Sequence, residues 1–146
     1  MKIKKLDPNA TLPKYGSEYA AGADLYACIA DGEKGILIAP GETKLIHTGI
    51  AMEIPQGFVG LVYARSGLAT KRGLAPSNKV GVIDCDYRGE LMVSLYNQSG
   101  ETQKVEHGER IAQLVITPYI TVEFEEVDEL SETVRGEGGF GSTGTK

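Results

Sequence analysis

Two internal segments of this sequence carry residue types that bind anions or activate water. The segment ARSGLA at 64–69 places Arg65 and Ser66 where a strand runs into a short predicted helix, and free backbone amides at such a point attract an anion. The segment NKVGVIDCDYRGE at 78–90 places Asp84 at the end of an apolar strand, where a carboxylate can bind a metal or activate water. Each also has a plainer explanation, because serine caps helices and aspartate stabilises turns.

The last twelve residues, RGEGGFGSTGTK, form a third segment of interest. They contain five glycines and one aromatic residue, which is too little apolar surface to fold unaided. Arg135, Ser142 and Thr143 supply a forked cation and two hydroxyls, and the glycines let backbone amides turn toward an anion. Phe140 has a planar ring as its expected partner. A plain disordered tail is the alternative, whereas a P-loop is excluded because its lysine and hydroxyl residue occur here in reversed order.

Other catalytic schemes find little support in the sequence. His47 and His107 have no nucleophile and orienting acid in an evident motif, so both are expected to be surface residues. Cys28 and Cys85 have neither metal-site spacing nor the density of a disulfide scaffold, and are expected to be small core or turn residues. Asp24, in AGADLYA at 21–27, says little on its own.

The charge balance excludes several classes of partner. Fifteen basic and 20 acidic residues give a net charge of −5. A negative net charge is unfavourable for binding duplex DNA or an anionic membrane. The basic start MKIKK has no apolar signal region behind it, and no apolar run approaches the length of a membrane span. We therefore expect a cytoplasmic protein with no direct nucleic-acid or membrane partner.

The elements that must position these residues are predicted to be strands. Glycine and proline interrupt the chain so often that only 119–135 exceeds ten residues without either. Between the breaks apolar residues alternate, as in the run from Ile46 to Ile54, which is typical of a half-buried strand. Further strands are expected at 36–39, 58–64, 79–84, 90–97, 110–117 and 121–127. One short helix is expected at 66–73, with Ser66 as its N-cap and Gly73 at its end.

This pattern predicts an antiparallel sandwich, jelly roll or barrel followed by an arm. Six acids in the ten residues 123–132 indicate an exposed strand edge and linker. The predicted division is a β domain at 1–131 and a flexible glycine-rich arm at 132–146.

Together these segments resemble the five ordered motifs of the homotrimeric deoxyuridine triphosphatase (dUTPase) family. The motifs are AGADLYA at 21–27, ARSGLA at 64–69, NKVGVIDCDYRGE at 78–90, GERIAQLV at 108–115 and RGEGGFGSTG at 135–144. Any one is weak, but the ordered set covers nearly the whole chain. Two departures are minor: Ala64 stands where many members have proline, and Cys85 where serine or alanine is common.

The resemblance implies an all-β fold, an antiparallel jelly roll or distorted barrel with one short helix. It implies a homotrimer with three active sites at subunit boundaries, in which the arm completes a neighbouring site. The implied reaction is Mg²⁺-dependent hydrolysis of dUTP to dUMP and pyrophosphate. This reaction limits uracil incorporation into DNA and supplies dUMP for dTMP synthesis.

The resemblance also implies residue roles. Asp84 corresponds to the acid that activates the attacking water at the α-phosphorus, and Asp24 to the acid that holds waters of the Mg²⁺ shell. The α- and β-phosphate binders correspond to Arg65, Ser66, Gly67 and Gln113, and the γ-phosphate clamp to Arg135, Gly141, Ser142 and Thr143. Uracil is read by a hairpin that includes Asn78, Val82 and Met92, with Tyr87 under the deoxyribose and Phe140 over the base.

Two rival functions stay open at this point. A dCTP deaminase has a related fold, although the chain is short and VIDCDYRG differs from that family's active-site pattern. A non-catalytic nucleotide sensor is the second alternative, and the presence of Asp24, Arg65, Asp84 and the complete arm argues against it.

Overall fold

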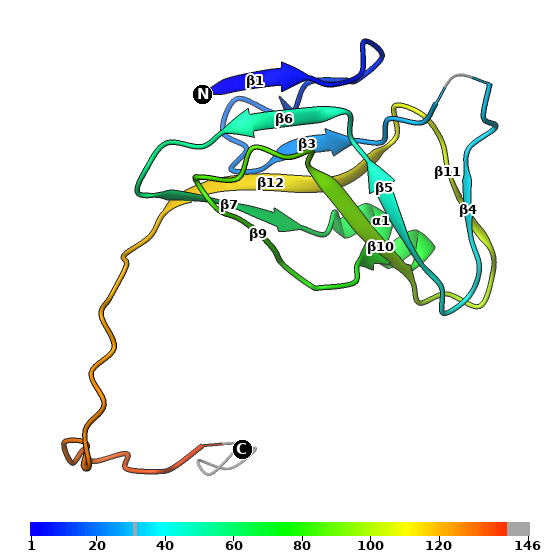
Figure 1. Cartoon of the computed structure of the whole chain (residues 1–146). Coiled ribbons are helices and arrows are strands. Elements are labelled where there is room, and N and C mark those ends of the chain that lie inside the picture. Colours follow the sequence, from blue (N-terminus) through cyan, green and yellow to red (C-terminus); the bar gives the residue numbers. More distant parts are fainter. Residues whose placement is uncertain (31, 140–146) are drawn as a thin grey trace.

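Antiparallel strands dominate the computed structural model, which describes residues 1–30 and 32–139 (Figure 1). Within these residues there is one helix, α1 (Ser66–Arg72). The strands are β1 (Lys2–Lys5), β2 (Lys14–Tyr15), β3 (Ala23–Tyr26), β4 (Ile36–Ile38), β5 (Thr43–His47), β6 (Ile50–Glu53), β7 (Phe58–Tyr63), β8 (Leu74–Pro76), β9 (Gly81–Ile83), β10 (Met92–Asn97), β11 (Gln103–Val105) and β12 (Arg110–Pro118). The predicted all-β class with one short helix is confirmed.

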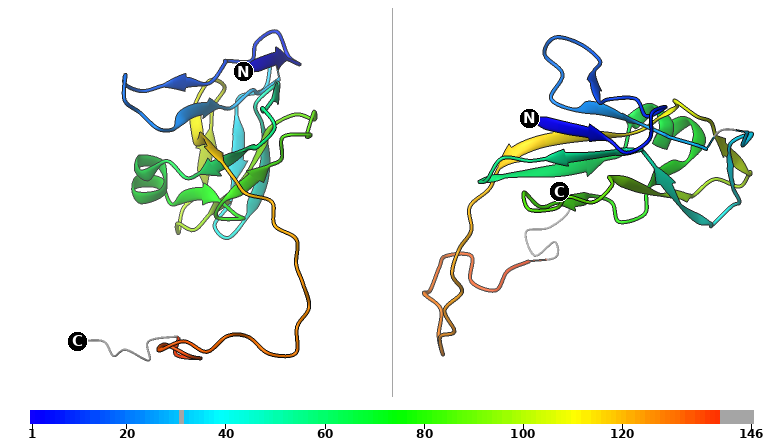
Figure 2. Two further views of the ribbon diagram at one scale, coloured as in Figure 1. Left: turned by 90° about the vertical axis from the view of Figure 1, so that its left-hand side faces the viewer. Right: turned by 45° about the horizontal axis from the view of Figure 1, so that its top comes forward.

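The strands form one five-stranded sheet and three smaller sheets around a shared core. The largest has the order β2-β3-β12-β7-β9, and β5-β10-β8, β1-β6 and β11-β4 complete the body (Figures 1 and 2). Fully buried aliphatic side chains come from different sheets, including Leu25 of β3, Ile46 of β5 and Leu95 of β10. Burial of this shared apolar surface holds the sheets together as a jelly roll.

The alternation from Ile46 to Ile54 points into the core as predicted, but it belongs to two strands rather than one. β5 ends at His47 and β6 begins at Ile50. Gly49 between them has φ +68°, and a Cβ added there would lie 2.8 Å from the Ala10 side chain. The turn therefore requires glycine, and it moves the chain from pairing with β10 to pairing with β1.

The helix lies where the sequence predicts it, but the prediction that Ser66 is its N-cap is wrong. Arg65 holds the N-cap position in extended conformation without a side-chain capping bond, and Ser66 is the first helical residue. The end is as predicted, because Gly73 adopts φ +66° and its N–H donates to the Ala69 carbonyl. The Ser66 hydroxyl therefore lies in the first turn and has no capping role.

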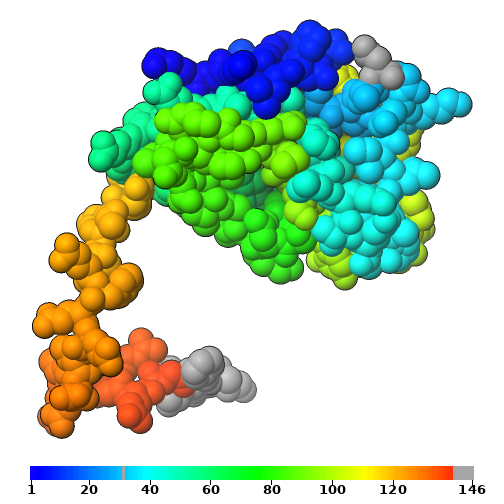
Figure 3. All heavy atoms as spheres, viewed as in Figure 1, coloured from blue at the N-terminus to red at the C-terminus, as the bar shows by residue number. Residues whose placement is uncertain are grey.

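The predicted strand at 121–127 is absent from this chain. β12 ends at Pro118, and residues 119–139 contain neither helix nor strand. They run away from the body (Figures 1 and 3). No strand of the described body pairs with this segment, and an unpaired strand lacks the backbone hydrogen bonds that would stabilise it. The division at 131 into a domain and an arm stays a prediction. Within 1–30 and 32–139, no helix is long and apolar enough to cross a bilayer.

Candidate active site

Five of the predicted site residues line one cavity of about 270 Å³, here called the arginine pocket. β3 and β12 bring Asp24 and Gln113 together as direct cross-strand partners. The pocket is lined by Gly16, Ser17, Ala20, Gly22, Asp24, Arg65, Ser66, Gly67, Arg110 and Gln113. Motifs at 21–27, 64–69 and 108–115, which are distant in sequence, thus meet at one place.

Asp24 holds two arginines at this pocket. Its carboxylate accepts a hydrogen bond from Arg65 Nε at 2.7 Å on one oxygen and from Arg110 Nη1 at 3.3 Å on the other. Asp24 is buried, so the paired cations offset the cost of removing its charge from water. One carboxylate between two guanidinium groups leaves a positive excess and several N–H donors at the cavity, which suits an anion.

Gln113 is also held in a defined orientation. Its Nε2 donates to the Ala64 carbonyl at 2.9 Å. A Cβ at Gly22 would lie 2.7 Å from Gln113 Oε1, so the glycine of AGADLYA leaves the space that this side chain occupies. Packing against Gln113 thus explains why the motif contains Gly22, which has no side chain to take part in chemistry.

A second cavity, of about 260 Å³, collects four further predicted residues and is here called the hairpin pocket. It lies where the turn between β9 and β10 meets β5. The predicted pairing of a hairpin is wrong, because β9 pairs with β7 and β10 pairs with β5 and β8, so the two strands belong to different sheets. The word hairpin is kept here only for the segment from Asn78 to Met92, which turns back on itself at residues 84–91. Its lining is Leu45, Val82, Ile83, Asp84, Tyr87, Glu90 and Met92. Val82 is 62% exposed, and Met92 is also exposed, so two apolar side chains face water beside the Asp84 carboxylate. Such a site suits a ligand with a flat apolar face and polar edges.

Tyr87 is fixed by its own turn. Its hydroxyl donates to the Glu90 carbonyl at 3.0 Å, and its N–H donates to the Asp84 carbonyl at 3.2 Å. A Cβ at Gly89 would meet the end of the Tyr87 ring, so with any other residue here the ring would have to shift. Arg88 Nη1 closes the turn by donating to the Cys85 and Tyr87 carbonyls.

The two pockets share no lining residue, and the sheet register separates them. Asp24 pairs with Gln113, which pairs with Tyr63, while Ile83 pairs with Gly60. Asp84 therefore lies three strands across and about four residues along from Asp24, a separation of roughly 20 Å at ordinary sheet spacings. Groups so far apart on one chain do not contact the same reacting phosphate.

The remaining predicted residues lie in neither pocket or beyond the described chain. Asn78 precedes β9 and does not line the hairpin pocket. Arg135 lies in the segment after β12, where its Nε donates to the Gly138 carbonyl. Phe140, Gly141, Ser142 and Thr143 lie outside the described residues.

Sequence reasoning missed Arg110 and Glu90. Arg110 lines the arginine pocket and donates a hydrogen bond to Asp24. Its place in the motif GERIAQLV, three residues before Gln113, is the sequence feature that could have identified it. Glu90 lines the hairpin pocket, and its acceptor role depends on contacts with His47 and Gly49, which no local sequence pattern reveals.

The histidines and cysteines have no catalytic arrangement among the described residues. His47 is exposed and contacts Glu90, and His107 is exposed and accepts a hydrogen bond from the Ile29 N–H. Within 1–30 and 32–139, no cluster of three or more His, Cys, Asp or Glu side chains is able to hold a metal.

Tyr119, at the start of the terminal segment, contacts the Cys85 thiol at 3.9 Å. This contact raises the pKa of Tyr119, and the nearby Asp84 charge raises it to a smaller extent.

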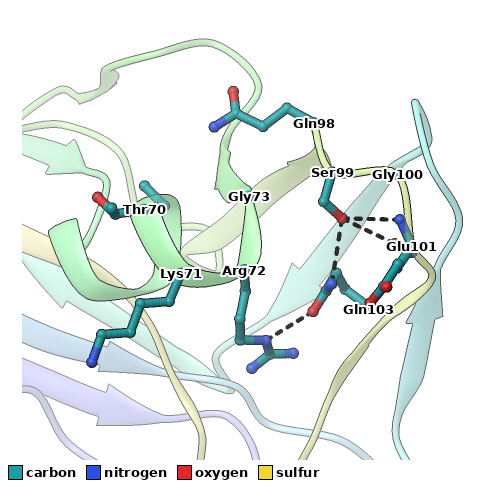
Figure 4. Close-up of a pocket in the computed structure, with 10 residues that line it drawn as sticks. Thr70, Lys71, Arg72, Gly73, Gln98, Ser99, Gly100, Glu101 and Gln103 are labelled. Atoms are coloured by element: carbon teal, nitrogen blue, oxygen red, sulfur yellow. Dashed lines mark hydrogen bonds between the residues drawn. The ribbon is translucent and has the colours of Figure 1, made fainter.

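A larger cavity, about 770 Å³, is elsewhere and is lined by none of the predicted residues. It lies between the end of α1 and the loop around Ser99 (Figure 4). Arg72 points toward this loop, but its guanidinium is already bonded to Gln103, Glu109 and the Lys104 carbonyl. Its charge is therefore neutralised within the fold.

Comparison with known proteins yields one consistent family. The dUTPase family profile matches residues 8–144. The chain is 52% identical to the deoxyuridine 5'-triphosphate nucleotidohydrolase of Escherichia phage T5, over 100% of this chain and 99% of the relative. It is 47% identical to the Acinetobacter baumannii protein of the same name, with 99% and 97% covered. The structure of Staphylococcus bacteriophage 80alpha dUTPase with dUPNHPP is similar with a TM-score of 0.84 and 33% identity, covering 98% and 97%.

We predict that Arg65→Ala weakens binding of inorganic tripolyphosphate by about 10- to 100-fold, because the loss of one hydrogen bond to a charged group lowers the affinity by about this factor. Isothermal titration calorimetry measures the affinity. Lys71→Ala is the matched control, because Lys71 is a cation in the helix that Arg65 precedes and does not line the pocket. Equal affinities in the two variants would remove Arg65 from anion binding.

Proposed function

The chain belongs to the dUTPase family, and on that premise we propose that it hydrolyses dUTP to dUMP and pyrophosphate. The observation that carries this proposal is the pairing of an arginine-rich pocket with a separate hairpin pocket that contains Asp84 and Tyr87. In the cell the reaction limits uracil incorporation into DNA and supplies dUMP for dTMP synthesis. We propose a cytoplasmic location, which agrees with two cysteines that form no disulfide.

The hairpin pocket is the proposed site of the deoxyuridine. Val82 and Met92 flank the uracil, which main-chain groups of the hairpin beginning near Asn78 read by hydrogen bonds. A rigid set of donors and acceptors rejects a base of the wrong polarity by roughly 10⁴–10⁵-fold. Tyr87 lies under the deoxyribose and fills the space of a 2′-hydroxyl, so UTP is refused. The bonds that hold the Tyr87 ring in its turn support this role. Phe140 covers the base.

The arginine pocket is the proposed site of the α- and β-phosphates. Arg65 is aimed by Asp24, Ser66 and Gly67 contribute the first turn of α1, and Gln113 is held by the Ala64 carbonyl. The γ-phosphate is clamped by residues of the arm, namely Arg135, Gly141, Ser142 and Thr143. Short-range donors of this kind neutralise a triphosphate even though the whole chain has a net charge of −5.

Asp84 is the proposed base for the attacking water. Its carboxylate is exposed in the hairpin pocket beside the deoxyriboside site, so it can orient a water at the α-phosphorus. The water oxygen forms a bond to the α-phosphorus, its proton passes to Asp84, and the bond to the bridging oxygen of the departing pyrophosphate breaks. In such a transfer the protein contributes mainly by positioning the attacking water and by stabilising the negative charge on the departing pyrophosphate.

Asp24 and the substrate phosphates fit Mg²⁺ as the cofactor. Mg²⁺ prefers oxygen ligands and is commonly held by one or two carboxylates together with phosphates and waters. Asp24 is the carboxylate that lines the arginine pocket, so it would accept hydrogen bonds from waters of the ion. When bound, Mg²⁺ supplies charge neutralisation on the triphosphate. Asp24 also keeps Arg65 and Arg110 in place.

A homotrimer with shared active sites is the proposed assembly. The separation of roughly 20 Å between Asp24 and Asp84 is too large for one α-phosphate, so the arginine pocket of one chain must face the hairpin pocket of another. The arm then crosses to a further site, because twelve extended residues reach roughly 40 Å. Ordering glycine-rich backbone costs entropy, so the arm closes when phosphate and base are both bound and excludes water.

Release of pyrophosphate from dUTP, dTTP, dCTP and UTP, each with Mg²⁺ and with chelator, tests the function. We expect pyrophosphate release from dUTP alone, and its loss when chelator is added. The C5 methyl group of thymine collides with the pocket, cytosine presents the wrong hydrogen-bond donors and acceptors, and the 2′-hydroxyl of UTP collides with Tyr87. Ammonia release from dCTP would instead support the deaminase alternative. Nucleotide binding without release of either product would support a non-catalytic sensor.

We predict that Asp84→Asn binds dUTP with near-normal affinity but lowers kcat by about 10²–10⁴-fold, the usual contribution of a general base. Calorimetry and pyrophosphate release separate the two effects. Asp86→Asn is the matched control, because Asp86 is an exposed carboxylate in the same turn that does not line the hairpin pocket. Near-normal kcat in Asp84→Asn would reassign the base.

We predict that a chain ending at Ser131 still folds and trimerises but loses most turnover, because the γ-phosphate clamp and the cover over the base are removed. Circular dichroism and light scattering check the fold and assembly, and pyrophosphate release measures the loss. A chain lacking only Thr145 and Lys146, which follow the arm motif, serves as the control. Full activity in the chain ending at Ser131 would exclude the arm from the mechanism.

A further inference from the structure

We propose that Glu90 is a positioning residue that sets Tyr87 for selection of 2′-deoxynucleotides. This inference rests on the proposed function, in which Tyr87 fills the space of a 2′-hydroxyl. Glu90 lines the hairpin pocket beside Tyr87 and also lines a neighbouring cavity with His47 and Gly49. It therefore connects the hairpin to the turn between β5 and β6.

The Glu90 carboxylate is anchored by both of its oxygens. Oε1 accepts a hydrogen bond from the Gly49 N–H at 2.8 Å, and Oε2 lies 2.9 Å from His47 Nδ1. The side chain is only 21% exposed. Both carboxylate oxygens of Glu90 therefore have a partner outside the hairpin. Because the side chain is also half-buried, these two contacts fix its orientation.

The anchor point itself is rigid. Gly49 adopts φ +68°, and a Cβ there would collide with the side chains of Ala10 and Cys28. Its carbonyl accepts hydrogen bonds from the Leu6 and Asp7 N–H groups. The turn at Gly49 is thus held from several directions and offers a fixed reference for Glu90.

The other end of the connection reaches the tyrosine ring. The Tyr87 hydroxyl donates to the Glu90 main-chain carbonyl at 3.0 Å. The Leu91 N–H, which belongs to the same peptide group as that carbonyl, donates to the Ile50 carbonyl at 2.8 Å and orients the peptide plane. The anchored carboxylate holds the Glu90 Cα on the other side of the carbonyl, so the two bonds together keep the group that receives the tyrosine hydroxyl in place. Loss of the carboxylate bonds lets the ring turn away from the sugar.

Glu90→Ala, Glu90→Gln and Glu42→Ala test this proposal. We expect Glu90→Ala to reduce the preference for dUTP over UTP in kcat/KM by about tenfold. Glu90→Gln should keep the preference, since its amide oxygen still accepts the Gly49 N–H. Glu42 is the matched control: its carboxylate also accepts a backbone N–H, from Ala39, and pairs with Lys44, but away from the hairpin.

A second measurement is independent of turnover. The ratio of dUMP to UMP affinity, by calorimetry, should fall in Glu90→Ala and stay unchanged in Glu90→Gln and Glu42→Ala. A merely structural role would lower both affinities equally, and an unchanged ratio in Glu90→Ala would overturn the proposal. If the unmodified protein releases no pyrophosphate from dUTP, the proposed function fails while the dUMP to UMP ratio still decides the role of Glu90.

Discussion

The register of the five-stranded sheet is the constraint on which the rest of the structure depends. It places Asp24 beside Gln113 at one end of β12 and sets β9, with Asp84 after it, on the far edge of the sheet. Strand spacing is nearly invariant in proteins, so side-chain flexibility does not bring the two groups to one phosphate. The spacing of the two pockets is the basis for the proposal that a second copy of the chain completes the nucleotide site.

The two pockets solve different physical problems. In the arginine pocket a buried carboxylate holds two guanidinium groups, so positive charge is oriented before an anion arrives and little is lost to reorganisation. The hairpin pocket instead uses backbone geometry, in which Gly89 and the Glu90 carbonyl fix the Tyr87 ring. In the proposed function, charge complementarity in one pocket and shape in the other are what let an acidic chain select one polyanion among several similar ones.

Local chemistry made part of this arrangement predictable from sequence. Alternation identified the inward face from Ile46 to Ile54, and the glycine after two basic residues marked the end of α1. The break at Gly49 was not predictable, because it follows from contacts with Ala10 far along the chain. The strand expected at 121–127 failed for a related reason, since alternation does not supply a pairing partner. Arg110 and Glu90 acquire their roles only through partners on other strands.

Complementation between two variants, one impaired at Asp84 and one at Arg65, tests the shared site most directly. Asp84→Asn and Arg65→Ala chains are unfolded together, refolded as a mixture, and assayed for pyrophosphate release from dUTP. If Asp84 and Arg65 of one site come from different chains, about a quarter of the sites in random assemblies regain both residues and the mixture is far more active than either variant. Activity no greater than the mean of the two separate variants would contradict the account.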